Sequence, residues 1–237
     1  MKLQFSRLAG LFPDICLALL VVSALSSASL WAAQASDAVG GGATINSATG
    51  AAQLRQCLSD LKAADVEFRD LGNQTKEGCT VEGAIELDAV ASPFGKVSLT
   101  AKPTLACVFA RHFTLWIRDV GAPLALAYMG SKLTAIETGP GLVCRNRIGE
   151  LGEKLSEHAK GDAIDIMAFR FESGQKLSVK EASASTKIDG VLMKTLRTTA
   201  CGYFTTVLGP GSNEAHKEHF HFDYGLHGQT DNYRICE

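Results

Sequence analysis

Apolar positions from residue 54 onward follow helical spacing in some segments and strand spacing in others, which predicts a mixed fold. Residues recurring every three or four positions predict helices over 54–64, 103–117 and, with mostly helical spacing, 188–207. Short apolar runs bounded by turn residues predict strands at 66–71, 81–87, 96–100, 133–137, 142–145, 163–169 and 176–179. We therefore expect an α+β domain with a small, mainly antiparallel sheet and helices packed on one face.

The N-terminal segment predicts export. Lys2 and Arg7 precede an apolar run that reaches Trp31 and ends in Ala33-Gln34-Ala35. This order of positive, apolar and small residues is typical of a secretory signal peptide over residues 1–35, so we expect a periplasmic protein. If the leader were retained instead, it would tether the chain to the membrane. Residues 36–52, rich in glycine, alanine and serine, predict a flexible linker, which leaves 53–237 as the functional domain.

Six cysteines follow the predicted leader, and an even number in an exported chain indicates three disulfides. Pairing neighbours in sequence closes the shortest loops and favours Cys57 with Cys79, Cys107 with Cys144, and Cys201 with Cys236. A cysteine-rich zinc site is not favoured, because no C-x-x-C spacing occurs. The formal net charge of −2 provides no large basic field, so we expect no nucleic-acid partner.

Two segments carry the candidate chemistry. The first, residues 156–166, reads S-E-H-A-K-G-D-A-I-D-I and places His158 and Asp165 on either side of a turn at Gly161. Asp165 is an isolated charge in an apolar strand, and burying a carboxylate is costly unless it is paired or binds a metal. Catalytic Zn²⁺ commonly takes three protein ligands from His, Asp and Glu. His158 and Asp165 would supply two of them.

The second segment, residues 216–223, reads H-K-E-H-F-H-F-D. Strand alternation places His219, His221 and Asp223 on one face, with Phe220 and Phe222 packed on the other. Two imidazoles are thereby aimed at the same point, and one histidine of this segment would complete the zinc site.

The two segments together resemble the D-alanyl-D-alanine metallopeptidases, through S-x-H-x-x-G-x-A-x-D from Ser156 and E-x-x-H from Glu218. With Cys144-Arg145 and V-L-G-P at 207–210, the chain resembles more closely the bacterial extensin-like C-terminal domain family, over about residues 55–237. The resemblance implies zinc bound by His158, Asp165 and His221.

The resemblance leaves the general base open. Glu218 stands where the carboxypeptidase branch has its base, whereas His216, His219 and His221 match the H-x-x-H-x-H arrangement of the endopeptidase branch. Strand geometry favours His219, because Glu218 should face the opposite side. A turn before His219 would restore Glu218, which the resemblance ranks first. Arg145 or His216 would stabilise the oxyanion, and the Arg145 guanidinium could also grip a substrate carboxylate.

Resemblance and compartment together imply a function. An exported zinc peptidase of this kind would meet peptidoglycan, and we expect it to cleave stem peptides or their cross-links, as an endopeptidase or a carboxypeptidase. The alternative is a zinc-stabilised module that binds the cell wall, or regulates other cell-wall proteins, without turnover.

Overall fold

The computed structural model describes residues 47–147, 154–231 and 233–237. The predicted signal peptide and residues 36–46 of the predicted linker lie outside this part of the chain. The helical elements are α1 (Ser47–Ala63), α2 (Cys107–Trp116), the π-helical η1 (Ile117–Gly121), α3 (Ala122–Met129), the 3₁₀ turn η2 (Glu157–Lys160), α4 (Val179–Ser183), α5 (Ile188–Ala200) and the 3₁₀ turn η3 (Glu214–His216). The strands are β1 (Val66–Lys76), β2 (Cys79–Ser92), β3 (Gly95–Leu99), β4 (Thr104–Ala106), β5 (Leu133–Thr138), β6 (Ala163–Phe171), β7 (Lys176–Ser178), β8 (Thr206–Leu208), β9 (Phe220–Asp223) and β10 (Ile235–Cys236).

Within the described residues, ten strands form one sheet in the order β1-β2-β3-β5-β6-β9-β8-β10, with β4 paired to β2 and β7 to β6. The β3–β5 and β8–β10 pairs are parallel and the other pairs are antiparallel. The predicted α+β class with a mainly antiparallel sheet is confirmed. The sheet is larger than predicted, because the strands of the N-terminal third extend the same sheet that carries β6 and β9.

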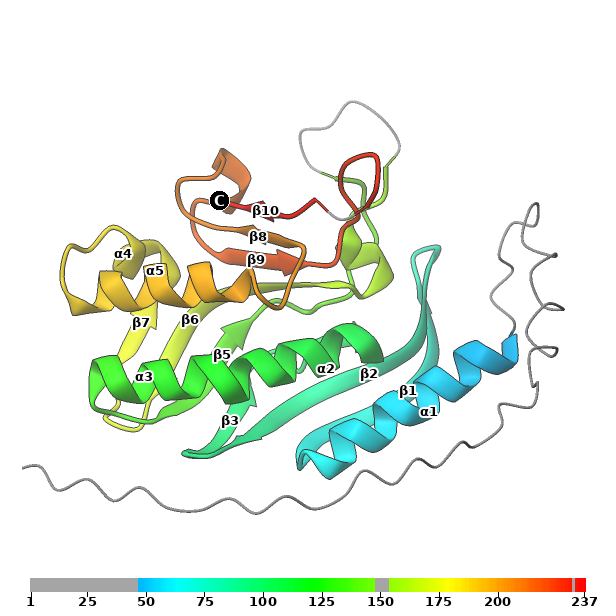
Figure 1. The fold of residues 1–237 in the computed structure, drawn as a ribbon, viewed down its shortest axis with the longest axis horizontal. Coiled ribbons are helices and arrows are strands. Elements are labelled where there is room, and N and C mark those ends of the chain that lie inside the picture. The colour runs from blue at the N-terminus through cyan, green and yellow to red at the C-terminus, as the bar shows by residue number, and fades with distance from the viewer. Residues whose placement is uncertain (1–46, 148–153, 232) are drawn as a thin grey trace, which may run out of the picture. The chain divides into compact units, whose positions relative to one another are not determined.

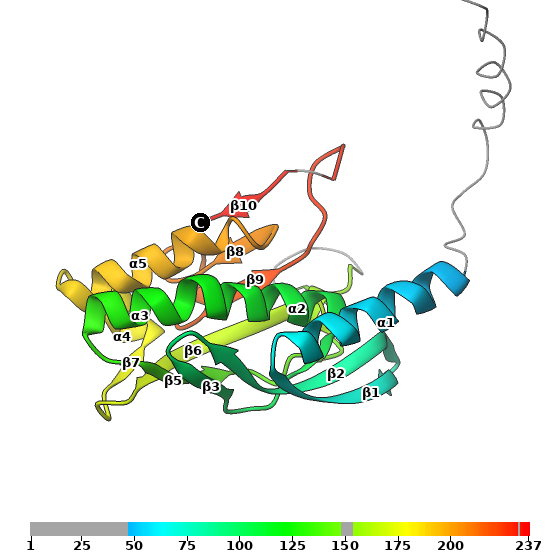
Figure 2. The ribbon, with the colours of Figure 1, turned by 60° about the horizontal axis from the view of Figure 1, so that its bottom comes forward.

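The helices α1, α2, α3 and α5 lie along one face of this sheet (Figures 1 and 2). Ile164 and Ile166 of β6 and Phe220 and Phe222 of β9 are fully buried in the core on this side. The ring of Trp116 on α2 meets Phe222 edge-on, with centroids 5.2 Å apart. Because side chains alternate along a strand, the residues between these apolar positions face the opposite side of the sheet.

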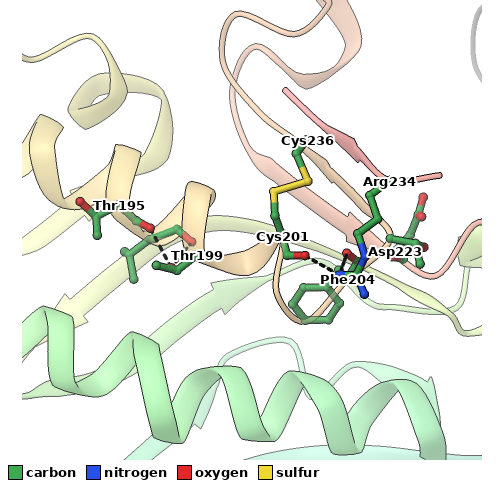
Figure 3. Close-up of a disulfide and its surroundings, with 9 residues drawn as sticks. Thr195, Thr199, Cys201, Phe204, Asp223, Arg234 and Cys236 are labelled. Atoms are coloured by element: carbon green, nitrogen blue, oxygen red, sulfur yellow. Dashed lines mark hydrogen bonds between the residues drawn. A yellow bond between two sulfur atoms is a disulfide. The ribbon is translucent and has the colours of Figure 1, made fainter. Parts of the chain in front are cut away.

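Three disulfides join Cys57 to Cys107, Cys79 to Cys144 and Cys201 to Cys236 in the described chain. The pairing predicted for Cys201 and Cys236 is confirmed, and it fastens the C-terminal strand β10 to the end of α5 (Figure 3). The other two predicted pairings are wrong. Cys57 lies on α1, which packs against α2 where Cys107 stands, and Cys79 lies in the β1–β2 hairpin. The packing of the elements that carry these cysteines therefore determines which of them form disulfides, and the length of the loop that each disulfide closes does not.

Several predicted boundaries shift where sheet pairing competes with helical spacing. Residues 104–106 pair with β2 as strand β4, so the helix expected from Pro103 begins at Cys107. The segment 142–145 is no strand, because Leu142 and Val143 donate instead to the carbonyls of Thr104 and His158. Helix α1 begins at Ser47, so the last part of the predicted linker is helical. Among the described residues, no helix has the length and apolar character needed to span a bilayer.

Candidate metal centre

Three of the predicted ligands converge on the sheet face that lies away from the helices. Asp165 on β6 stands directly opposite His221 on the neighbouring antiparallel strand β9. The Asp165 Oδ1 atom lies 2.9 Å from His221 Nδ1 and 3.3 Å from His158 Nε2. One ligand atom from each of His158, Asp165 and His221 lies within 4.8 Å of the others. This arrangement offers two imidazole nitrogens and one carboxylate oxygen to a single cation.

The hydrogen bonds made by the ring nitrogens of His158 and His221 that point away from Asp165 are consistent with metal binding by the other nitrogen of each ring. His158 Nδ1 donates to the carbonyl oxygen of Gly141 at 2.8 Å, and His221 Nε2 donates to Asp223 Oδ2 at 2.9 Å. A neutral imidazole has only one N–H group. His158 Nε2 and His221 Nδ1 therefore each face Asp165 as a lone pair unless the ring in question is protonated. Two imidazolium rings with centroids 5.1 Å apart would repel each other, whereas one divalent cation satisfies both lone pairs and the carboxylate.

The local sequence places His158 through a short capped turn. Ser156 caps η2, with its hydroxyl accepting from the backbone N–H of His158 at 3.3 Å. Gly161 ends this turn at φ 71°, as predicted, and a Cβ there would lie 2.8 Å from the backbone nitrogen of Ala106. Gly141 is equally constrained, at φ 78°, because a Cβ would lie 2.3 Å from the Thr104 carbonyl oxygen. The Gly141 carbonyl oxygen, which accepts the hydrogen bond from the His158 ring, thus belongs to a backbone position that only glycine can occupy.

The electrostatic coupling within the site is strong. Burial alone would raise the pKa of Asp165, but its contacts with His158 and His221 outweigh burial and hold that pKa far below its usual range. Burial alone would lower the pKa of His221, but the hydrogen bonds to Asp165 and Asp223 raise it to about 9. Asp165 is therefore ionised at every physiological pH, and without a metal His221 holds the proton that a metal would displace.

His216 and His219 stand beside these three residues. The His219 Nε2 atom lies 3.5 Å from Asp165 Oδ1, and the ring centroids of His216 and His221 lie 5.2 Å apart. Burial lowers the pKa of His219, and burial together with the neighbouring histidines lowers the pKa of His216 to about 4. Both rings are therefore neutral at pH 7, and each can accept a proton.

Glu218 lies apart from this cluster. A turn over residues 217–218 does precede His219, yet the Glu218 carboxylate points toward Lys180, with Oε1 2.6 Å from Nζ, and is 52% exposed. The ion pair with Lys180 lowers the pKa of Glu218. Glu218 lines a surface hollow beside β6 and β7, which adjoins the metal site through His219 but does not include Asp165 or His221. Of the two candidate bases, the structure brings only His219 into contact with Asp165.

The cluster opens into a cavity of about 250 Å³, which we call the metal-site cavity. Arg145, His216 and His219 line it together with Asp165 and His221. A second guanidinium, from Arg147, also lines it and is held 3.1 Å from the buried carboxylate of Glu157. This wall can bind an anionic or carbonyl group.

Three further residues of the cavity wall, Thr206, Asp223 and His227, had no role assigned from the sequence. Strand alternation had placed Asp223 on the face of His221, but its hydrogen bond to that ring becomes visible only in the fold. Thr206 carries no signal in the sequence, because its place depends on the β8–β9 pairing. His227 is an isolated histidine in a polar segment and gave no pattern.

One of three comparisons with known proteins identifies the family of the chain. No curated protein and no solved structure matches the chain significantly. The model of the family described as "Extensin-like protein C-terminus" matches residues 55–237, which include both histidine-bearing segments. The chain therefore belongs to the extensin-like protein C-terminus family.

Proposed function

We propose that this protein is a zinc-dependent peptidase that hydrolyses amide bonds in peptidoglycan stem peptides or their cross-links in the periplasm. The observation that supports it is the convergence of His158 Nε2, Asp165 Oδ1 and His221 Nδ1 beside a neutral His219 in a solvent-connected cavity. Two histidines and one carboxylate are a ligand set of catalytic zinc enzymes. A bound zinc ion would supply Lewis acidity, which activates a water molecule and polarises a carbonyl group.

His219 is the general base in this proposal. Its Nε2 atom is directed at the ligand carboxylate, and its lowered pKa keeps a lone pair available at neutral pH. The ring would take a proton from the attacking water and deliver it to the leaving amine. Glu218 is less suited to this role, because its carboxylate is committed to Lys180 outside the metal-site cavity.

Arg145 is the residue we assign to the developing oxyanion or to a substrate carboxylate. Its side chain lines the metal-site cavity, and within the described residues it makes one hydrogen bond, a long one of 3.4 Å to the carbonyl oxygen of Asn146. His216 is less suited, because its Nδ1 donates to Asn213 Oδ1 at 2.7 Å and its neutral ring then presents a lone pair. A guanidinium always retains donors for an anion.

The substrate class follows from the resemblance to D-alanyl-D-alanine metallopeptidases and from the predicted export signal. Those two features favour a peptide of the bacterial wall over a nucleic acid or a cytoplasmic substrate. The cavity wall supports the same class, because Arg145 can receive a carboxylate such as those that stem peptides carry.

The test is hydrolysis of purified muropeptides by the zinc-loaded protein, followed by chromatography of the products. Removal of zinc, or the substitution Asp165→Asn, should abolish cleavage. His219→Gln should reduce kcat by about 10²- to 10⁴-fold, the range of a lost general base. Glu218→Gln is the matched control and should retain most of the activity. Binding to isolated sacculi without release of soluble fragments would support the wall-binding module instead, and a loss of activity only in Glu218→Gln would reverse the assignment of the base.

A further inference from the structure

A chain of hydrogen bonds extends from the metal-site ligand His221 to a histidine outside the two sequence motifs. Behind His221, the Nε2–H group donates to Asp223 Oδ2 at 2.9 Å. Thr206 stands directly opposite Asp223 in the β8–β9 pairing, and a contact from its hydroxyl is among the causes that lower the pKa of the Asp223 carboxyl. The Oγ1 atom of Thr206 lies 2.7 Å from His227 Nε2. The connected side chains are therefore His221, Asp223, Thr206 and His227.

The Asp223 carboxylate determines which group donates and which accepts in each of these hydrogen bonds. An ionised carboxylate only accepts hydrogen bonds, so both His221 and Thr206 must donate to Asp223. The Thr206 hydroxyl has one proton and uses it on Asp223. His227 Nε2 must therefore carry the hydrogen that Thr206 Oγ1 accepts. Each member of the chain orients the next, and once His221 is neutral the bond from its Nε2 leaves Nδ1 as the lone pair on the side of Asp165.

The surroundings hold this chain in place. His221 and Asp223 are each 7% exposed and Thr206 is 4% exposed, so water competes little for their bonds. The backbone N–H of Gly225 donates to Asp223 Oδ1 at 2.7 Å, which occupies the second carboxylate oxygen. A Cβ at Gly225 would lie 3.1 Å from that oxygen and 3.2 Å from His227 Nε2. The absence of a side chain there allows the segment after β9 to return and place His227 against Thr206.

The C-terminal end of this segment is fastened to the same strands. The backbone N–H of Ile235 donates to Thr205 at 2.9 Å, and Arg234 donates to the carbonyls of Cys201 and Phe204. The Cys201–Cys236 disulfide closes the connection (Figure 3). The segment that carries His227 is thus anchored at both ends, on β9 and on β10.

We infer that Thr206 and His227 are positioning residues for the metal centre, which act through Asp223 to orient His221 and strengthen metal binding. This inference rests on the metal site of the proposed function. Partners behind a metal-ligating histidine fix its tautomer and ring orientation, and their loss typically weakens metal binding 10- to 100-fold. Because Thr206 and His227 act one and two steps behind Asp223, we expect weakening of about 10-fold, at the lower end of that range.

The experiment measures the Zn²⁺ dissociation constant of the full chain by competition with a chromophoric chelator. Thr206→Val keeps the shape of the side chain and removes the hydroxyl, so it should weaken zinc binding about 10-fold. Thr206→Ser restores the hydroxyl and should restore the affinity. Thr205→Val is the matched control, because the neighbouring Thr205 hydroxyl contacts the backbone carbonyl of Asp223 and not its carboxylate. It should leave the zinc affinity unchanged.

His227→Leu tests the other end of the chain, on a partly exposed segment where folding is less at risk than at buried Thr206. It should weaken zinc binding to a similar extent, and His227→Gln, which keeps an N–H donor, should recover part of the loss. Absorption spectra of the Co²⁺-substituted variants should shift only where the affinity falls. Wild-type affinity in both Thr206→Val and His227→Leu would overturn the inference, as would an equal loss in Thr205→Val.

The outcome also separates this inference from the proposed activity. If the wild-type protein binds zinc, the variants weaken it as expected and no muropeptide is cleaved, the positioning role stands and the peptidase proposal fails. If cleavage occurs while the variants keep wild-type zinc affinity, the peptidase proposal stands and the positioning role fails. Absence of zinc binding by the wild-type protein would overturn both.

Discussion

Zinc should stabilise this fold by an amount that depends on Asp165. His158, Asp165 and His221 lie on three separate elements, η2, β6 and β9, so a metal bound by all three cannot bind the unfolded chain equally well. At a free zinc concentration 100 times the dissociation constant, binding to the native state alone adds about 2.7 kcal/mol to the free energy of unfolding. For a domain of this size, that corresponds to a rise in Tm of about 5–11 °C.

The perturbation is Asp165→Asn, which keeps the shape of the side chain and removes its charge. Because an amide oxygen is a much poorer zinc ligand than a carboxylate oxygen, we expect the zinc-dependent rise in Tm of this variant to fall to about zero at the same zinc concentration. The substitution also changes the metal-free protein, since it removes the ion-pair partner of His221. Comparing each variant with and without zinc cancels that effect and isolates the contribution of the metal.

The assay is thermal unfolding by differential scanning calorimetry or circular dichroism, in matched buffers with chelator or with zinc. Glu218→Gln is the control, because it makes the same chemical change at an exposed carboxylate outside the metal-site cavity. It should keep the full zinc-dependent rise. An equal rise in Asp165→Asn and in the wild type would refute the reasoning, and so would a wild-type Tm that zinc does not change.

Two further predictions concern pH. Because the pKa of His221 is raised to about 9 in the protein without metal, zinc must displace a proton from this ring below that pH. The apparent zinc affinity, measured by chelator competition, should therefore rise by up to about tenfold per pH unit between pH 6 and pH 8. An affinity that does not change with pH would contradict this prediction. Burial, and to a lesser extent the nearby Glu157 carboxylate, raises the pKa of Asp162 to about 6. Because this native-state pKa exceeds the value in the unfolded chain, the ionised carboxylate destabilises the native state above pH 6, and this destabilisation disappears below pH 4. In chelator, Asp162→Asn should therefore raise the free energy of unfolding by up to about 3 kcal/mol at pH 7.5 and by much less at pH 4, measured by urea unfolding. Equal effects at both pH values would exclude a titration origin.

The parts of the site that the sequence predicted are those that depend on local geometry. Alternation along a strand is a property of the backbone, so placing His219 and His221 on one face opposite Phe220 and Phe222 required no tertiary information. The turn at Gly161 likewise follows from a backbone conformation that side chains resist. The direct opposition of Asp165 and His221 needed one more condition, that β6 and β9 be neighbours.

The parts that could not be predicted depend on partners distant in the sequence. Glu218 and Lys180 are 38 residues apart, and nothing in the local sequence indicates that this ion pair turns the carboxylate away from the metal-site cavity. The disulfide of Cys57 with Cys107 likewise reflects the packing of α1 on α2, which the rule of shortest loops ignores. Thr206 contributes to the site only because β8 pairs with β9. In each case the deciding contact is tertiary.

The two faces of the sheet explain why this site can exist in a stable fold. Bringing Asp165, His158 and His221 together removes ionisable groups from water, which costs free energy unless a cation or a set of hydrogen bonds compensates. On the opposite face, fully buried residues such as Ile164 and Phe222 pack against the helices and hold the same two strands in register. The apolar face thus supplies the hydrophobic packing that the polar face lacks. A metal bound at the polar face would relieve the remaining cost, so removal of the metal should loosen η2 and the residues before β9 first, while the register of β6 and β9 persists.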